Sequence, residues 1–153
     1  MKHNWFECKI RYEKTMENGM NKKVTEPYLV DALSFTEAEA RIIEEITPFI
    51  SGEFTVADIK RANYSELFPC DEEAADRWFK CKLIFITLDE KSGAEKKTST
   101  QVLVQATDLR DAVKKLDEGM KGTMADYQIA SVAETPLMDV YPYSAEPDDK
   151  PEV

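Results

Sequence analysis

Two short stretches of this chain share one unusual pattern. Trp5-Phe6-Glu7-Cys8-Lys9-Ile10 is followed 73 positions later by Trp78-Phe79-Lys80-Cys81-Lys82-Leu83. The chain contains only 2 Trp and 3 Cys, so the pattern Trp-Phe-x-Cys-Lys-apolar is not expected twice by chance. We therefore predict two tandem copies of one structural unit.

The spacing persists beyond this motif. Gly19 and Gly93 are 74 positions apart, and Ile43 and Leu116 are again 73 apart. Small length differences of this kind are tolerated in turns and loops. The whole chain, and not only its opening motif, is therefore expected to be duplicated.

The first copy begins with a predicted hairpin. Apolar and polar residues alternate over 5–12, which is typical of a half-buried strand. Asn18-Gly19 favours the turn, and a second strand is expected over 23–32. Pro27 lies inside that strand and has no N–H donor, so it favours a position at a sheet edge.

A helix and a third strand complete the first copy. Ser34 and Thr36 offer two registers for the helix cap, and the helix is expected to end near Thr47-Pro48. Its predicted apolar stripe comprises Phe35, Ala38, Ile42, Ile46 and Phe49. Ser51-Gly52 is the alternative end of this helix. A third strand is expected over 56–64, and residues 67–69 are expected to close the copy.

The second copy repeats this order. Strands are expected from residue 78 onward, over 98–106 and over 127–134, with a helix capped by Thr107 or Asp108. Residues 137–141 are expected to mirror the end of the first copy.

Each copy is therefore predicted to be a β-β-α-β unit. A hairpin followed by a helix crossover returns the third strand parallel to the second, with strand order 2-1-3 and the helix on one face. The predicted fold class is α+β, a tandem duplication of this unit with mixed, mostly antiparallel sheet. We divide the chain into a first repeat (1–69), an acidic connector (70–77), a second repeat (78–143) and a disordered acidic tail (144–153). The pattern leaves open whether the repeats form one sheet or two.

Charge and composition narrow the functional classes. The net charge of −10 argues against a general affinity for nucleic-acid phosphates. No apolar run approaches the roughly 20 residues needed to span a bilayer. With no apolar signal-peptide core at its N-terminus, the protein is expected in the cytoplasm.

No motif indicates catalysis, a cofactor or a metal. His3 is the only histidine and lies near the terminus, so a Ser-His-Asp or Cys-His site has little support. Cys8 and Cys81 occupy equivalent inward positions and are interpreted as small core residues, with a redox pair as the alternative. The acidic connector is interpreted as exposed rather than as a cation site. We expect a protein that is not an enzyme and needs no cofactor.

One surface pattern suggests binding. Aromatic side chains interleaved with cations on a sheet are typical of single-stranded nucleic-acid binding. The alternative is that both Trp side chains pack inside and that the lysines guard exposed edges. The candidate binding surface comprises Trp5, Lys9, Arg11, Lys60, Arg61, Trp78, Lys80 and Lys82. Our leading hypothesis is a module that binds a protein partner or itself, and the alternative is a single-stranded nucleic-acid-binding protein.

Three stretches of the chain, one of them overlapping the opening motif, resemble a known family. They are Asn4-Trp5-Phe6-Glu7-Cys8-Lys9, the run from Thr25 to Ala40 (TEPYLVDALSFTEAEA), and Gly122-Thr123-Met124-Ala125-Asp126-Tyr127. They are similar to short bacterial and phage-like proteins grouped as domain of unknown function 4494, over residues 3–143. The resemblance implies no substrate, cofactor or catalytic residue.

Overall fold

The chain folds into two compact units, each built around its own four-stranded sheet. The structure, a computed structural model, describes residues 3–143, so the predicted acidic tail lies outside the described residues. Unit 1 comprises residues 3–63 and 136–143 of the described chain, and unit 2 comprises Tyr64–Thr135. The predicted α+β class is confirmed. The sequence left open whether the repeats form one sheet or two, and the structure has two.

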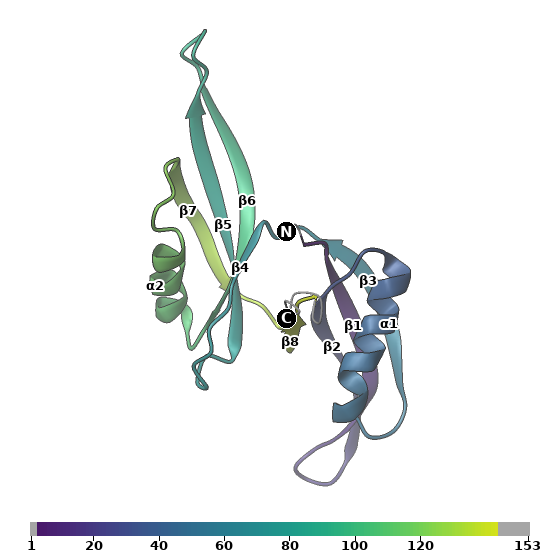
Figure 1. Ribbon diagram of the computed structural model, residues 1–153. Helices are drawn as coiled ribbons and strands as arrows, with labels where there is room; N and C mark the ends of the chain where they lie inside the picture. Colours follow the sequence, from purple (N-terminus) through teal and green to yellow (C-terminus); the bar gives the residue numbers. More distant parts are fainter. Residues whose placement is uncertain (1–2, 144–153) are drawn as a thin grey trace, which may run out of the picture. The chain divides into compact units, whose positions relative to one another are not determined.

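Unit 1 has the predicted β-β-α-β order and one added strand. Its sheet runs β3-β1-β2-β8, with β1 antiparallel to both neighbours and β8 parallel to β2. Helix α1 covers one face (Figure 1). The elements are β1 (Trp5–Thr15), β2 (Asn21–Asp31), α1 (Phe35–Ile46), a 3-10 turn (Thr47–Phe49), β3 (Phe54–Ala62) and β8 (Asp139–Tyr141).

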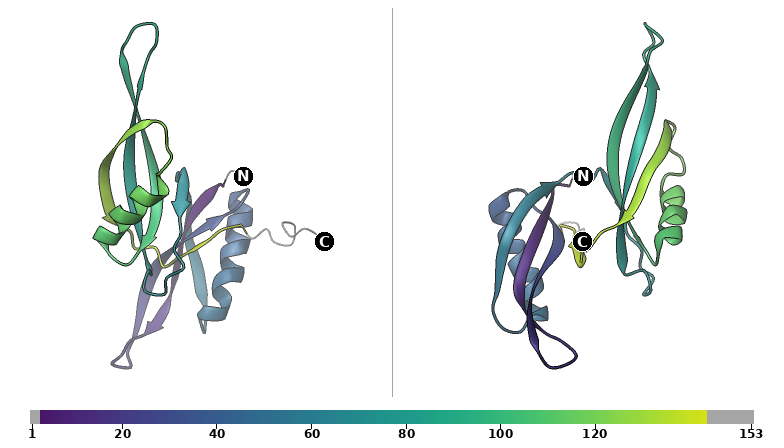
Figure 2. Two further views of the ribbon diagram at one scale, coloured as in Figure 1. Left: turned by 60° about the vertical axis from the view of Figure 1, so that its left-hand side comes forward. Right: turned by 180° about the vertical axis from the view of Figure 1, so that it is seen from behind.

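Unit 2 repeats this architecture. Its sheet runs β4-β6-β5-β7, with β5 antiparallel to both neighbours and β4 parallel to β6. The β5–β6 hairpin extends past α2 and β7 (Figure 2). The elements are β4 (Glu66–Phe68), β5 (Arg77–Leu88), β6 (Glu95–Ala106), α2 (Leu109–Gly119) and β7 (Asp126–Glu134). The predicted order 2-1-3 is therefore confirmed in both repeats.

Each unit has a separate core between its helix and the inner face of its sheet. Ala38, Ile42 and Ile46 of α1 are buried there, as are Ala112 and Leu116 of α2. The strand residues of the two cores are Phe6, Cys8, Ile10, Tyr28, Val30 and Ala32 in unit 1, and Phe79, Cys81, Leu83, Val102, Val104 and Ala106 in unit 2. Two residues of the predicted apolar stripe of α1 are not buried in this core. Phe35 is 49% exposed and Phe49 is 78% exposed.

The helices also fix the register of the duplication. Ser34 caps α1 through the N–H of Glu37, and Asp108 caps α2 through the N–H of Asp111, so the two helices correspond with a shift of 74. The predicted equivalence of Ile43 with Leu116 is therefore wrong. Ile42 is the buried counterpart of Leu116, whereas Ile43 is 39% exposed.

The last short strand of each repeat pairs with the sheet of the other repeat. β4 follows the first repeat but lies beside β6, and β8 follows the second repeat but lies beside β2. Residues 67–69, expected to close the first copy, therefore belong to unit 2. The sequence repeats (1–69 and 78–143) and the compact units thus have different boundaries.

The short connector after β3 explains this exchange. In unit 1, β3 and the β8 position are three strand spacings apart, roughly 14 Å. Ala62 is level with Asp31, whereas the pairing of β8 begins at Tyr28, roughly 10 Å back along the strand. The straight path is therefore roughly 17 Å, but the chain from Ala62 to Glu66 reaches at most about 14 Å. The first repeat cannot complete its own sheet.

Candidate functional site

The predicted binding surface is divided between two faces of the sheet in unit 1. The register places Trp5, Lys9, Arg11 and Lys60 together on the face opposite α1. Arg61 lies on the other face, where its guanidinium is 5.4 Å from the centre of the Phe6 ring.

Charges on the outer face of unit 1 are balanced. Lys60 is the cross-strand partner of Glu7, and Lys9 is the partner of Asp58. Opposite charges placed across strands stabilise a sheet. The arrangement therefore offers neighbouring carboxylates as well as cations, and not a continuous basic track.

Neither tryptophan is available for stacking in this conformation. Trp5 is 3% exposed and Trp78 is 5% exposed. The ring of His3 stacks on that of Trp5 at 5.2 Å. In unit 2, Trp78, Lys80 and Lys82 share the face opposite α2, and both lysines are exposed.

Residues that the surface prediction missed hold the exchanged strands in place. In unit 1, Arg41 of α1 contacts the β8 segment, which we define as residues 136–143. Its Nη2 donates to the carbonyl of Pro142 at 3.3 Å, and its guanidinium lies 5.2 Å from the centre of the Tyr143 ring. The Tyr143 hydroxyl donates to Glu37 at 3.2 Å. The helix therefore anchors the end of the β8 segment.

Lys115 of α2 has the corresponding position in unit 2. Its Nζ lies 3.2 Å from Glu72, just beyond the β4 segment (residues 64–70), and 2.8 Å from Asp111. Asp111 also accepts from the N–H and hydroxyl of Thr107. These donors, Lys115 first, lower the pKa of Asp111 to about 2. The hydrogen bond to Asp111 raises the pKa of Lys115, so the amine stays cationic.

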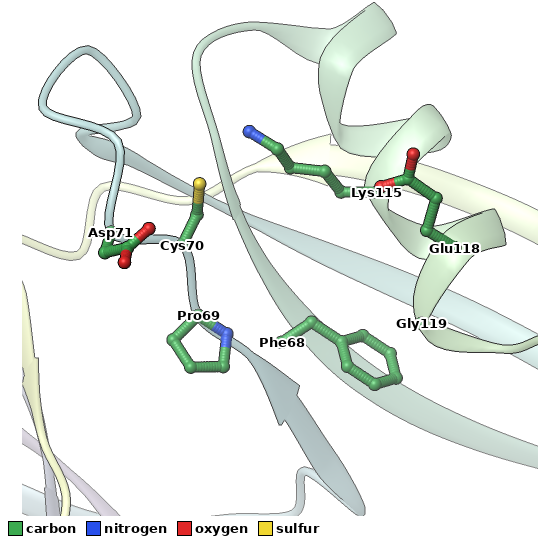
Figure 3. A pocket seen from close by; sticks show the side chains of 7 residues that line it. All are labelled: Phe68, Pro69, Cys70, Asp71, Lys115, Glu118 and Gly119. Carbon is green, nitrogen blue, oxygen red and sulfur yellow. The ribbon is translucent and has the colours of Figure 1, made fainter.

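An open surface pocket of about 710 Å³ lies beside this contact in unit 2. Figure 3 shows the Phe68 ring beside Gly119 and the Lys115 amine directed toward Cys70. Its lining residues are Phe68, Pro69, Cys70, Asp71, Lys115, Glu118 and Gly119. Lys115 therefore joins α2 to the connector that follows β4, through Glu72.

The inward cysteines behave as core residues. Burial raises the pKa of Cys8 to about 12 and that of Cys81 to about 11. The nearby Glu7 and Asp58 carboxylates raise the pKa of Cys8 further. Both thiols therefore stay protonated near neutral pH, and thiolates are the reactive form.

The outer edges of the two sheets, β3 and β7, have no partner strand within the described residues. Each carries a bulge, because the pairing shifts between Lys9 and Ile10 in unit 1 and between Lys82 and Leu83 in unit 2. Bulges at sheet edges limit uncontrolled pairing with other chains. The charges differ, however: β3 carries Lys60 and Arg61, whereas β7 has no Lys or Arg.

The exchanged segments do have a sequence signal. Glu66-Leu67-Phe68-Pro69 and Asp139-Val140-Tyr141-Pro142 share the pattern acid-aliphatic-aromatic-proline, 73 positions apart. That pattern identifies them as equivalent, and it says nothing about which sheet receives each one.

Residues 3–143 contain neither a metal-ligand cluster nor a membrane-spanning helix. Across residues 3–143, no cluster of three or more His, Cys, Asp or Glu side chains is arranged to hold a metal ion. Neither helix in that range is long and apolar enough to cross a membrane.

Comparison with known proteins places the sequence in one family. A family model described as a domain of unknown function, DUF4494, matches residues 4–143. No curated protein matches the chain. Because the match covers nearly all of the described residues, the chain belongs to the DUF4494 family.

Proposed function

We propose that this chain is a non-enzymatic protein-interaction module, which binds a protein partner or a second copy of itself. The observation that carries the proposal is the outer edge of β7. This nine-residue strand has unpaired backbone groups on one side within the described chain. An extended segment of another protein can add to such an edge through main-chain hydrogen bonds.

The side chains of β7 favour pairing with another chain, because they lack the charges that commonly prevent it. Lysine on an edge strand commonly prevents pairing with other chains. Between Asp126 and Glu134 the strand has only uncharged residues, so it lacks that protection. Ile129 on this strand is 38% exposed, and Met124 just before it is 95% exposed.

Helix α2 extends this apolar surface. Gly119 lies on the flank of α2 that contacts β4, against Phe68. The helical period places Leu109 and Val113 on the opposite flank, toward β7. These two side chains are 50% and 36% exposed. A partner strand on β7 would therefore find apolar contacts beside its backbone hydrogen bonds.

No observation favours the nucleic-acid alternative over this proposal. It needs exposed aromatic rings, and both tryptophans are buried. We place the interaction in the cytoplasm, because all three cysteines of the chain are free thiols and reduced thiols are typical of that compartment.

A matched pair of lysine substitutions tests the proposal. Gln128→Lys adds a cation to β7, and Thr55→Lys adds one at the equivalent exposed position of β3, 73 positions earlier. We expect Gln128→Lys to reduce partner retention in pull-downs from the native cell, and self-association in sedimentation, at least fivefold. Thr55→Lys should leave both unchanged.

The outcomes separate clearly. Equal loss in both variants would show that added charge, and not the β7 edge, is responsible. A strictly monomeric wild-type protein that retains no partner would contradict the proposed function itself.

A further inference from the structure

We infer that the β8 segment can leave its own chain and complete unit 1 of a second copy, so that two chains exchange these segments reciprocally. This inference goes beyond the proposed function, because it uses the β2 edge of unit 1 and not the outer edge of β7. The acceptor is the β2 edge together with the flank of α1 that carries Arg41. The occupant is residues 136–143 of another identical chain.

The fourth strand of the unit 1 sheet, β8, comes from the end of the second repeat and pairs with β2 over a short length. Only three residue pairs join β8 to β2, namely Tyr28↔Asp139, Leu29↔Val140 and Val30↔Tyr141. The N–H of Met138 adds one bond to the carbonyl of Pro27 at 2.8 Å. Proline has no N–H, so β2 offers no donor at residue 27 for a longer ladder. The pairing is therefore short and local.

Side-chain contacts of the segment are equally local. The ring of Tyr141 stacks on Tyr28 at 6.2 Å, and Arg41 and Glu37 hold Pro142 and Tyr143 as described above. Every one of these acceptor groups belongs to β2 or α1. A second chain presents the same groups, so these particular contacts can form in either chain.

The donor side permits the exchange. Thr135 is fixed to unit 2, because its N–H and hydroxyl both donate to the carbonyl of Trp78. Only residues 135–138 separate β7 from β8, and Pro136 lies among them. A hinge of this length leaves few residues for folding back within one chain, and shortening a hinge is a known route to exchange between chains.

The equivalent β4 segment is not free to exchange in this way. It continues directly into β5 through residues 69–76, and Lys115 holds this connector at Glu72. Releasing β4 would therefore also require this connector to leave α2. The inference concerns β8 alone, and two reciprocal donations of it give a closed twofold dimer.

A disulfide trap tests the exchange in the full-length chain. Leu29 and Val140 are direct partners across the parallel ladder, which is a spacing that a disulfide can bridge. Leu29→Cys and Val140→Cys are placed in separate chains, each also carrying Cys70→Ser. The two chains are mixed, refolded together at high concentration and oxidised. We expect a disulfide-linked heterodimer, and none when either chain is oxidised alone.

The chain carrying both substitutions is the control for geometry. If it forms its disulfide within a monomer, while the mixture gives no crosslinked heterodimer at any concentration, the inference is overturned. Retention of a partner through β7 would survive that result, because Gln128→Lys tests it separately.

A second test avoids the buried Leu29 position. Isotopically heavy and light wild-type chains are refolded together, and native mass spectrometry measures mixed dimers. A variant with four Gly/Ser residues inserted after Thr135 should show a dimer fraction at least fivefold lower, because a longer hinge favours closure within one chain. A dimer unaffected by the insertion would overturn the exchange and leave self-association through a sheet edge.

Discussion

The ring of Phe68 lies directly against the backbone of Gly119. A Cβ at position 119 would be 2.8 Å from the Cδ1 and Cε1 atoms of this ring. Gly119 ends α2, and Phe68 belongs to the exchanged strand β4. The missing side chain of Gly119 therefore makes room for a residue from the first sequence repeat.

Gly119→Ala should destabilise unit 2 despite the higher helix propensity of alanine. Overpacking of this kind typically costs about 1–3 kcal/mol, which exceeds the gain of up to about 1 kcal/mol from replacing glycine in a helix. Chemical denaturation monitored at residues of unit 2 measures the change.

Phe68→Leu provides the control for this steric explanation. The smaller side chain should make Gly119→Ala less costly than it is beside Phe68, giving a favourable coupling in a double-mutant cycle. Additive effects would show that the ring and position 119 do not interact.

Arg41→Gln should loosen the β8 segment without affecting β4. It removes the charged hydrogen bond to Pro142 and the cation–π contact with Tyr143, and hydrogen bonds to charged groups contribute about 1.5–3 kcal/mol. We expect hydrogen exchange at the Met138 amide, bonded to Pro27, to accelerate about tenfold or more.

Lys115→Gln is the matched control for Arg41→Gln. It should accelerate exchange at the Ser65 amide, which is bonded to Gln101, and leave Met138 unchanged. Equal acceleration of both amides in either variant would contradict separate anchoring.

Asp111 gives unit 2 a specific dependence on pH. Its folded-state pKa is lowered from 3.8 to about 2, so its contribution to stability is complete above its unfolded pKa and is lost as pH falls through the folded pKa. Asp111→Asn should therefore flatten the decline in stability between about pH 4 and pH 2. Urea midpoints measured across this range test the prediction, and an unchanged slope would contradict it.

The cysteines should differ sharply in reactivity. Cys8 and Cys81 are fully buried, and their pKa values are raised to about 12 and about 11, whereas Cys70 is partly exposed. At pH 8 a thiol reagent should modify one equivalent rapidly in the native protein and three after denaturation. Peptide mapping should identify Cys70, and rapid native labelling of Cys8 would contradict the assigned core.

The local architecture could be predicted because each of its signals is local. Alternation around Cys8 and Cys81 indicated the strands, Ser34 indicated the cap, and the repeated Trp-Phe-x-Cys-Lys pattern indicated two copies. These features depend on neighbours along the chain, so the sequence contains the information directly.

The partners of the exchanged strands could not be predicted in this way. Val140 and Leu67 lie in equivalent segments, and the acceptor strands around Leu29 and Leu103 are also equivalent. Side-chain pattern therefore fits either pairing equally well. The deciding factor is connector reach after β3, which becomes visible only once the strand order and register are known.

The residues of the candidate binding surface do not form one continuous exposed site, for a similar reason. Periodicity placed Trp5 and Trp78 correctly on the face opposite the helices, but it could not show that this face buries them. Arg61 was grouped with Lys60 although successive strand residues point to opposite faces. Arg41 and Lys115 were missed because their role depends on segments that are distant in sequence.

The central claim is that the last short strand of each repeat pairs with the sheet of the other repeat. Nuclear Overhauser contacts across the two parallel strand pairs test it most directly. We expect backbone contacts between Leu29 and Val140, and between Leu67 and Leu103. Contacts of Leu67 with Leu29, and of Val140 with Leu103, would show instead that each repeat completes its own sheet, and would contradict this topology.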